Sequence, residues 1–356
     1  MADLKLLKEI SLVNGISGHE KKATRVMKKY MEDSADEIVY DNLGSIIGIK
    51  KGKSDLKVLL TGHIDEIGFI VREIDEQGFI HVQPVGGWMG QNLPSSLMVI
   101  TTRDDKEIYG VFGSPSPHGK TLEERNKVIA PKDAFIDIGA SSKQDVKDLG
   151  IRLGDPITPV SEFTQMVNPK NIMSKAWDDR IGAAAVIDVM RHLKGKEIEC
   201  NLYCAGTVQE EVGLRGAKTV GQMVKPDIAI AIDVTFSQDL PGSKGDVKLG
   251  SGVALSVMDS SVIAHTGLLK ALENICEELN IPYEMDMIAA GGTDSGELSK
   301  VDAGVVNMTL SIPSRYMHSH RTIINTDDYD ATVQLLTAFV ERLDNNLYQE
   351  ILNDKR

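Results

Sequence analysis

Two adjacent glutamates, Glu210 and Glu211, stand one residue after an apolar run over residues 202–208. Where a strand turns into a helix, neighbouring side chains can point in different directions. One carboxylate can then bind a metal ion while the other takes up and returns protons. Adjacent glutamates are also common on solvated surfaces, where they do no chemistry. Which interpretation holds depends on the other polar residues that occupy comparable positions.

Further imidazole and carboxylate side chains stand at the end of an apolar run or in the loop just after one. They are His63, Asp65, Asp178, Asp179, Asp233 and His318. Imidazole nitrogen and carboxylate oxygen are common protein ligands of Zn²⁺ and related divalent ions. In an open α/β sheet, ligands bind in the crevice at the carboxyl ends of the strands. The pattern therefore predicts a metal-dependent hydrolase built on an α/β sheet.

Two imidazoles and three carboxylates from this set can hold two metal ions with three protein ligands each, provided that one carboxylate bridges the ions. The candidate ligands are His63, Asp178, Glu211, Asp233 and His318. Paired ions of this kind lie about 3.5–4 Å apart, and we expect a water or hydroxide between them. Glu210 stands next to a ligand without being needed as one, so it is the candidate general base. Asp65, two residues after His63, is placed to orient the imidazole.

Simpler explanations exist for parts of this set. A carboxylate pair just before a helix, such as Asp178 and Asp179, can serve as N-cap and first turn, although only one of the two can cap. A serine nucleophile would lack the G-x-S-x-G turn, which does not occur in this sequence. A glycosidase would need two carboxylates flanking the bond, such as Glu210 with Asp65 or Asp294, and would leave the histidines without a role.

The elements that must position these residues alternate between strands and helices. Apolar runs predict strands over residues 57–61, 201–207, 227–232, 283–288 and 304–310. Helical spacing predicts helices over residues 3–13, 17–31, 180–193, 214–223, 265–279 and 326–354. Ser17 lies three residues before Glu20, which is the spacing of a capping box for the second helix.

Between residues 68 and 163 the pattern changes. Short apolar pieces alternate with Gly, Pro and Asp turns, and helical periodicity nearly vanishes. This texture is typical of a small β-barrel or sandwich inserted into the chain. We therefore expect an α/β catalytic domain formed by residues 1–67 and 164–356, with residues 68–163 as an inserted β domain.

A glycine-rich turn, Gly291-Gly292-Thr293, follows the predicted strand at 283–288. Glycine lets a ligand approach the main chain closely, so we expect this turn to line the substrate. It lacks the lysine of a phosphate-binding P-loop, which argues against nucleotide binding.

Composition limits the partners of the chain. Its 39 basic and 52 acidic residues give a formal charge of −13, which disfavours nucleic acid or an anionic membrane surface. No apolar run is long enough to span a bilayer, and the N-terminus predicts an amphipathic helix rather than a signal peptide. Three cysteines suit a reducing compartment. We expect a cytoplasmic protein.

Six motifs in this order resemble those of the M42 metallo-aminopeptidases, a family that includes glutamyl, deblocking and tetrahedral (TET) aminopeptidases and proteins once called endoglucanase M. The motifs are GHIDEIGF, SKAWDDRIG, VQEEVGLRGA, AIDV, GGTDSG and RYMHSH. The resemblance implies a zinc-peptidase-type α/β catalytic domain with an inserted PDZ-like dimerisation domain. It also implies assembly as a homododecamer built from dimers, with the active sites facing an internal cavity.

The resemblance implies roles for the candidate residues. Asp178 would bridge the two ions and would be followed by a cis peptide bond. His63 and Asp233 would complete one metal site, and Glu211 and His318 the other. Glu210 would be the general base, and Asp65 would support His63.

The expected activity is hydrolysis of N-terminal residues from short peptides by a metal-bridging hydroxide, with zinc or cobalt, or else manganese, as the metal. Two alternatives stay open: an endoglucanase-type glycan hydrolase and a non-catalytic peptide-binding scaffold on the same fold. Lys244 or Arg315 could favour acidic substrates, although either can equally be a surface or structural charge.

Overall fold

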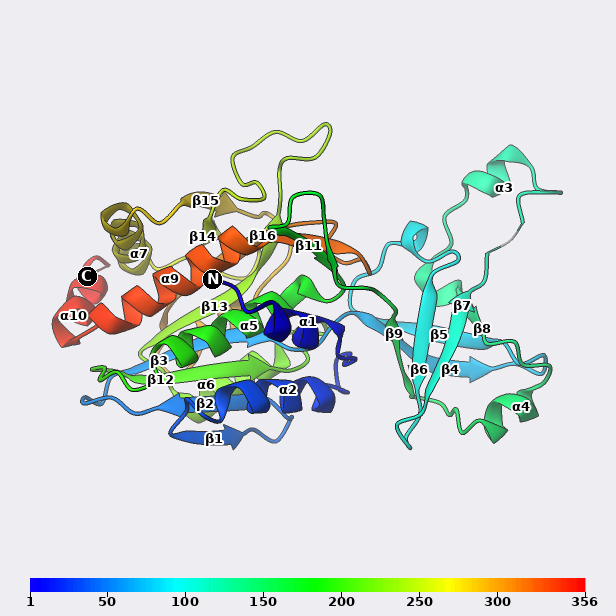
Figure 1. The fold of residues 1–356 in the computed structure, drawn as a ribbon, viewed down its shortest axis with the longest axis horizontal. Coiled ribbons are helices and arrows are strands. Elements are labelled where there is room, and N and C mark those ends of the chain that lie inside the picture. Colours follow the sequence, from blue (N-terminus) through cyan, green and yellow to red (C-terminus); the bar gives the residue numbers. More distant parts are fainter. Residues whose placement is uncertain (115, 356) are drawn as a thin grey trace.

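An eleven-stranded mixed sheet forms the centre of the larger part of the molecule (Figure 1). The computed structural model describes residues 1–114 and 116–355. The main strand order is β1 (Glu37–Tyr40), β2 (Ile46–Lys50), β12 (Asn201–Thr207), β3 (Lys57–His63), β13 (Ile228–Phe236), β16 (Val306–Arg315), β17 (Thr322–Asn325), β11 (Asn171–Ser174) and β10 (Thr164–Gln165). Beside this path, β14 (Val253–Met258) pairs with β16 and with β15 (Tyr283–Met287).

The four central strands, β12, β3, β13 and β16, run parallel to one another. Helices cover both faces of such a sheet, so its strands are apolar nearly throughout. This explains why the sequence shows unbroken apolar runs there rather than an alternating pattern. The carboxyl ends of these strands lie at one edge of the sheet, which is where the chemistry-bearing residues were expected.

Helices pack on both faces of the sheet (Figure 1). The larger apolar core contains residues of α1 (Leu4–Leu12), α2 (Lys21–Met31), α5 (Trp177–His192), α7 (Thr266–Leu279), α9 (Thr326–Arg342) and α10 (Asn345–Asn353). A separate core contains residues of α6 (Arg215–Val224) and α8 (Ser295–Leu298).

Helix α5 lies unusually close to strand β3 at Gly62. A Cβ at this glycine would lie 2.3 Å from the backbone nitrogen of Ala183, so only glycine permits this approach. The contact brings the first turn of α5 next to the end of β3. It thereby sets the distance between His63 and the pair Asp178–Asp179.

The inserted region forms a closed six-stranded barrel, in the order β4 (Gly68–Ile74), β5 (Ile80–Val85), β8 (Phe135–Asp137), β7 (Glu107–Phe112), β6 (Leu97–Thr101) and β9 (Pro156–Pro159). The predicted α/β fold with a small barrel is therefore confirmed. The barrel has its own apolar core, in which Phe69 stacks on Trp88 and packs edge-on against Phe112. Its loops carry the short helices α3 (Leu122–Asn126) and α4 (Lys143–Asp148), and the 3₁₀ turns η1 (Gly90–Asn92) and η2 (Pro131–Asp133).

Two predicted helices differ from the observed ones. Helix α2 begins at Lys21, and among the described residues no side chain caps it, so the predicted capping box of Ser17 and Glu20 is wrong. The predicted helix over 326–354 is broken after Arg342, because Asp344 caps a new helix by accepting the backbone N–H of Leu347.

Candidate active site

The register of the sheet places the carboxyl ends of the central strands side by side, in one row across the sheet. His63, the last residue of β3, pairs with Thr207, the last residue of β12. On the other side of β3, Asp233 pairs with Ser311. Asp233 lies within β13 rather than at its end, since that strand continues to Phe236. The row thus holds His63 and Asp233, and it lies just before the turn that carries Glu210 and Glu211.

Asp178 lies between the two candidate histidines. Its Oδ1 is 3.0 Å from His63 Nε2, and its Oδ2 is 3.3 Å from His318 Nε2. The two oxygens of one carboxylate therefore face two different imidazoles, as a bridging ligand requires. The peptide bond between Asp178 and Asp179 is cis.

The remaining carboxylates surround this centre. Ligand atoms of His63, Asp178 and Glu211 lie within 4.8 Å of one another, and so do those of His63, Glu210 and Asp233. The second group contains Glu210, which we predicted from the sequence to be the general base rather than a metal ligand. The structure thus brings all five candidate ligands and the candidate base into one cluster.

The buried carboxylates of this cluster repel one another, which favours the binding of cations. Burial, followed by repulsion from neighbouring carboxylates, raises the pKa of Glu211 to about 8 and the pKa values of Glu210 and Asp233 well above their usual range. Asp178 behaves differently: burial would raise its pKa, but hydrogen bonds from His318 and His63 hold that pKa well below its usual range. Glu211 Oε1 is buried and has no hydrogen-bond partner among the described residues. A metal ion would supply both the missing partner and the missing positive charge.

His63 is held by groups on both sides. Its Nδ1 donates to the backbone carbonyl of Asp65 over 3.1 Å, which leaves the lone pair of Nε2 for a metal. Its backbone N–H donates to Asp179 Oδ2 over 3.0 Å, and Asp179 Oδ1 accepts the N–H of Gly182 in α5. Asp179 is one of the polar residues that the sequence singled out, but we predicted no supporting role for it from the sequence. Its position after a candidate ligand was the available signal.

The Asp65 carboxylate does more than the expected support of His63. It lies 3.5 Å from His63 Nδ1, and it accepts the backbone N–H groups of Glu210 and Glu211 over 3.0 and 3.2 Å. It therefore fixes the turn that carries the two glutamates.

His318 follows strand β16 and has a left-handed backbone, with φ +55°. Its Nδ1 donates to the carbonyl oxygen of Gly87, over 2.8 Å, so that Nε2 is directed to Asp178. Gly87 belongs to the loop after barrel strand β5. The barrel therefore reaches the site, which the sequence did not reveal.

The predicted substrate-binding turn exposes Gly291 and Gly292. Thr293 is buried, and its hydroxyl is within hydrogen-bond distance of Asp259 Oδ2 and Thr309 Oγ1, so only the main chain of this turn is available to a ligand. Arg315 is paired with Asp239 through two nitrogen–oxygen contacts.

A sequence profile described as M42 glutamyl aminopeptidase matches residues 44–335 of the chain. The chain belongs to this family. It is 33% identical over 348 residues to the lysyl aminopeptidase of Pyrococcus furiosus, a match that covers 96% of this chain and 98% of that one. The M42 peptidases are metal-dependent, and the chain is a peptide hydrolase of this family.

Solved structures of TET aminopeptidases share the whole fold. The TET aminopeptidase of Thaumarchaeota archaeon SCGC AB-539-E09 is 36% identical, with a TM-score of 0.95 and coverage of 98% of both chains. The TET1 peptidase of Pyrococcus horikoshii, which can assemble into a tetrahedron or a large octahedral shell, is 30% identical, with a TM-score of 0.87 and coverage of 96% and 99%. Among the helices that the structure describes in this M42 chain, none is long and apolar enough to cross a membrane.

Proposed function

We propose that this M42 peptidase removes N-terminal residues from short peptides with two divalent metal ions, zinc or cobalt, or else manganese. The observation that carries the proposal is the position of Asp178, whose two carboxylate oxygens face His63 and His318 separately. His63 and Asp233 would complete one site around Asp178. Glu211 and His318 would complete the other.

The donor set fits such ions. It consists of two imidazoles whose Nδ1 groups are already engaged and of buried carboxylates that repel one another. Such ions would supply a Lewis acid for the substrate carbonyl and would lower the pKa of a bound water molecule.

Glu210 is the proposed general base. Its Oε2 lies 3.8 Å from His63 Nε2, at the edge of the cluster, and its backbone is fixed by Asp65. In the metal-free protein, burial first, and then the charges of Asp233 and Glu211, raise the pKa of Glu210. Glu210 would take a proton from the attacking water and return it to the leaving amine.

The exposed main chain of Gly291 and Gly292, with Thr293 behind it, is the proposed wall for the peptide backbone of the substrate. The formal charge of −13 disfavours nucleic acid as a substrate or partner. Three buried, unpaired cysteines favour a cytoplasmic enzyme.

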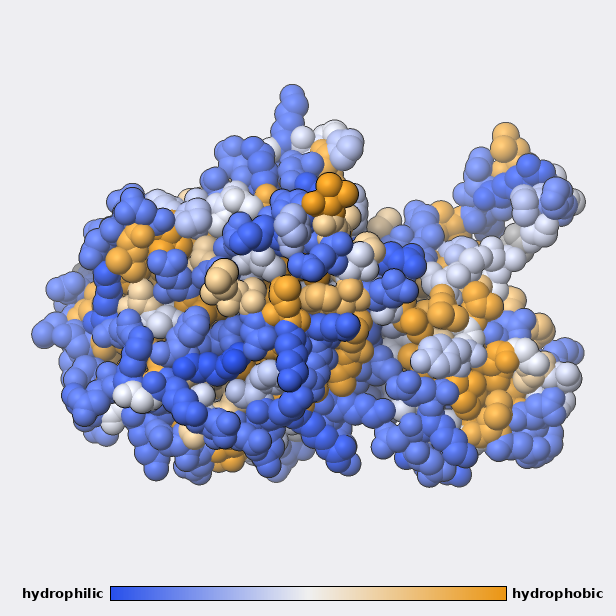
Figure 2. All heavy atoms as spheres, in the orientation of Figure 1, coloured by the Kyte–Doolittle hydropathy of each residue, from blue (hydrophilic) through white to orange (hydrophobic). Residues whose placement is uncertain are grey.

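Residues 68–163 are the proposed dimerisation domain, and residues 1–67 with 164–356 the catalytic domain. Apolar side chains gather on the barrel face in Figure 2. Leu97 and Val111, which pair across β6 and β7, are exposed, and so is Tyr109. An exposed apolar face of this kind supports self-association. Assembly of the dimers into a homododecamer is proposed from the family resemblance.

The test is a panel of aminoacyl-p-nitroanilides assayed with metal-free protein refilled with zinc, cobalt or manganese. We expect activity only after refilling with metal. Carboxymethylcellulose is the control substrate. Cleavage of that glycan by the metal-free protein would contradict the proposal and favour the glycan hydrolase.

A further inference from the structure

Two buried carboxylates accept three consecutive backbone N–H groups of the turn that carries the glutamates. Glu20 Oε1 accepts the N–H of Gln209 over 3.1 Å. Asp65 accepts the next two, those of Glu210 and Glu211, at 3.0 and 3.2 Å. Asp65 belongs to a motif that the proposed function uses. Glu20 comes from a distant segment to which that function assigns nothing.

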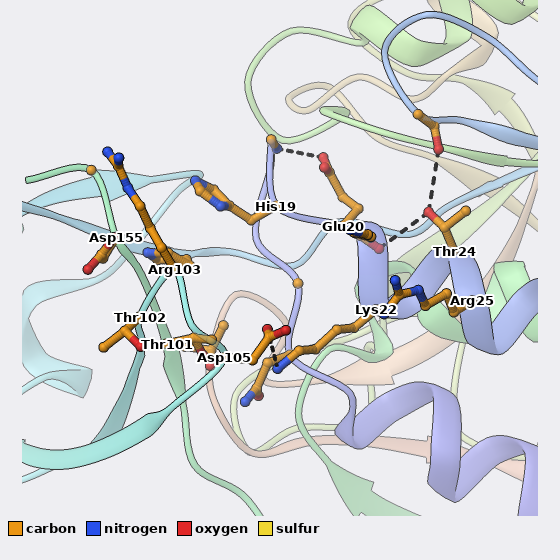
Figure 3. Close-up of a pocket in the computed structure, with 18 of the residues that line it drawn as sticks. His19, Glu20, Lys22, Thr24, Arg25, Thr101, Thr102, Arg103, Asp105 and Asp155 are labelled. Atoms are coloured by element: carbon orange, nitrogen blue, oxygen red, sulfur yellow. Dashed lines mark hydrogen bonds and ion pairs between the residues drawn. The ribbon is translucent and has the colours of Figure 1, made fainter. Parts of the chain in front are cut away.

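Glu20 lies between the turn and a cleft. It precedes α2 and is 5% exposed, on the wall of a cleft of about 830 Å³ that α2 and the barrel share. Figure 3 shows its carboxylate turned towards the backbone of the preceding loop, while Lys22 and Asp105 pair across the cleft at 3.3 Å. The same Oε1 also accepts the N–H of Gly18 over 2.6 Å. One oxygen atom of Glu20 therefore joins two loops.

Ser17, three residues before Glu20, belongs to the same hydrogen-bond network. Its hydroxyl donates to Asp65 Oδ2 over 2.6 Å instead of capping α2. The segment from Ser17 to Glu20 is thus linked to the turn in two ways. Ser17 binds Asp65, which holds the turn, and Glu20 holds the turn with its own carboxylate. These polar contacts replace the capping box that the spacing predicted.

The backbone conformation of Gln209 explains why the turn needs these hydrogen bonds. It has φ +57°, a left-handed conformation that costs a residue other than glycine about 1 kcal/mol or more. Its backbone sets the direction in which the following residue, Glu210, leaves the chain. Loss of the Glu20 contact would leave the Gln209 N–H without that acceptor and free the turn to relax.

We propose that Glu20 is a positioning residue that holds Glu210 in its working orientation through the backbone of Gln209. This inference rests on the proposed role of Glu210 as general base. It concerns only the geometry of Glu210, because Glu20 contacts none of the proposed metal ligands in the interactions described above.

The chemistry of Glu20 also indicates which substitution should conserve its role. Both hydrogen bonds end on Oε1, so the carbonyl oxygen of a glutamine can accept both of them. Burial, followed by repulsion from Asp65, raises the pKa of Glu20 to about 7, so burial at this position disfavours the charged form of the carboxyl group. Aspartate keeps the charge but withdraws the acceptor by one methylene group.

The test compares Glu20→Ala, Glu20→Asp and Glu20→Gln in the metal-loaded enzyme, with Lys22→Ala as a control from the same cleft. Glu20→Ala and Glu20→Asp should lower kcat about 10- to 100-fold, the cost of misplacing a catalytic group by about 1 Å. KM should change less than about threefold, and calorimetric titration with Zn²⁺ should still give two ions per chain. Glu20→Gln and Lys22→Ala should keep kcat within about threefold of the parent.

Three results would overturn the inference: unchanged kcat in Glu20→Ala, equal losses in the Asp and Gln variants, or loss of bound Zn²⁺ in any of them. If Glu20→Ala does not fold, the comparison of Asp with Gln decides. Failure of the proposed function has a different signature, since Glu210→Gln would then retain turnover with metal bound, whatever the Glu20 variants do.

Discussion

His318 Nδ1 donates a 2.8 Å hydrogen bond to the carbonyl oxygen of Gly87, a residue contributed by the barrel. The contact is tight, since a Cβ on Gly87 would lie 3.0 Å from that same nitrogen, and a Cβ on Gly86 would lie 3.0 Å from Glu211 Oε2. The inserted barrel thus touches both residues proposed to complete one of the two metal sites.

Gly87→Ala should therefore weaken one metal ion selectively. The methyl group forces the His318 imidazole to shift, and a disturbed second-layer contact lowers metal affinity about 10- to 100-fold. Calorimetric titration with Zn²⁺ should show one weakened and one nearly unchanged site. Lys106→Ala, at an exposed residue of the barrel, is the control. Two unchanged sites in Gly87→Ala would contradict the role given to Gly87.

Glu210→Gln should separate proton transfer from metal binding. Glutamine has nearly the same shape but cannot take a proton, so kcat should fall by about 10²- to 10⁴-fold. Two ions per chain should remain bound, measured by elemental analysis after dialysis. Near-normal turnover with both ions present would remove Glu210 from the mechanism.

Asp178→Asn should act on metal binding itself. An amide cannot offer two anionic oxygens, so both ions should lose affinity by more than the roughly 100-fold effect of a supporting residue. Competition with a chelator of known affinity measures this loss. Asp104→Asn, at an exposed carboxylate, is the control. Tight binding of two ions by Asp178→Asn would show that this residue does not bridge them.

Stability should depend on pH through Glu20. Burial raises its pKa from 4.5 to about 7, so the folded protein holds the proton more tightly than the unfolded chain. The contribution of Glu20 to the free energy of unfolding is therefore largest below pH 4.5. It falls as the pH rises towards 7, by about 3 kcal/mol in total. Glu20→Gln does not ionise. Its free energy of unfolding in urea, relative to the parent, should therefore increase between pH 5 and pH 8, and a constant difference would contradict the shifted pKa.

Much of the fold follows from local patterns. Unbroken apolar runs mark the central strands because both faces of a parallel sheet are buried. The barrel is evident from its short strands and turns. The sequence also placed His63 and Glu211 where parallel strands end, and such ends necessarily meet at one edge of the sheet.

Other parts of the site could not be predicted, because they depend on how distant loops dock. The hydrogen bond from His318 to Gly87 forms only when the loop after barrel strand β5 packs against the end of β16 in one orientation. Left-handed backbone at Gln209 and His318 redirects side chains in a way that no periodicity encodes. Ser17 and Glu20 have the spacing of a helix cap, but their partners lie far along the chain, at Asp65 and Gln209.

The most direct test of the account is a crystal structure of the zinc-loaded enzyme with diffraction data collected at the zinc absorption edge. The account predicts two anomalous peaks about 3.5–4 Å apart, one on each side of the Asp178 carboxylate. One peak should lie beside His63 and Asp233, and the other beside Glu211 and His318. A single peak, or peaks away from Asp178, would contradict the two-metal centre.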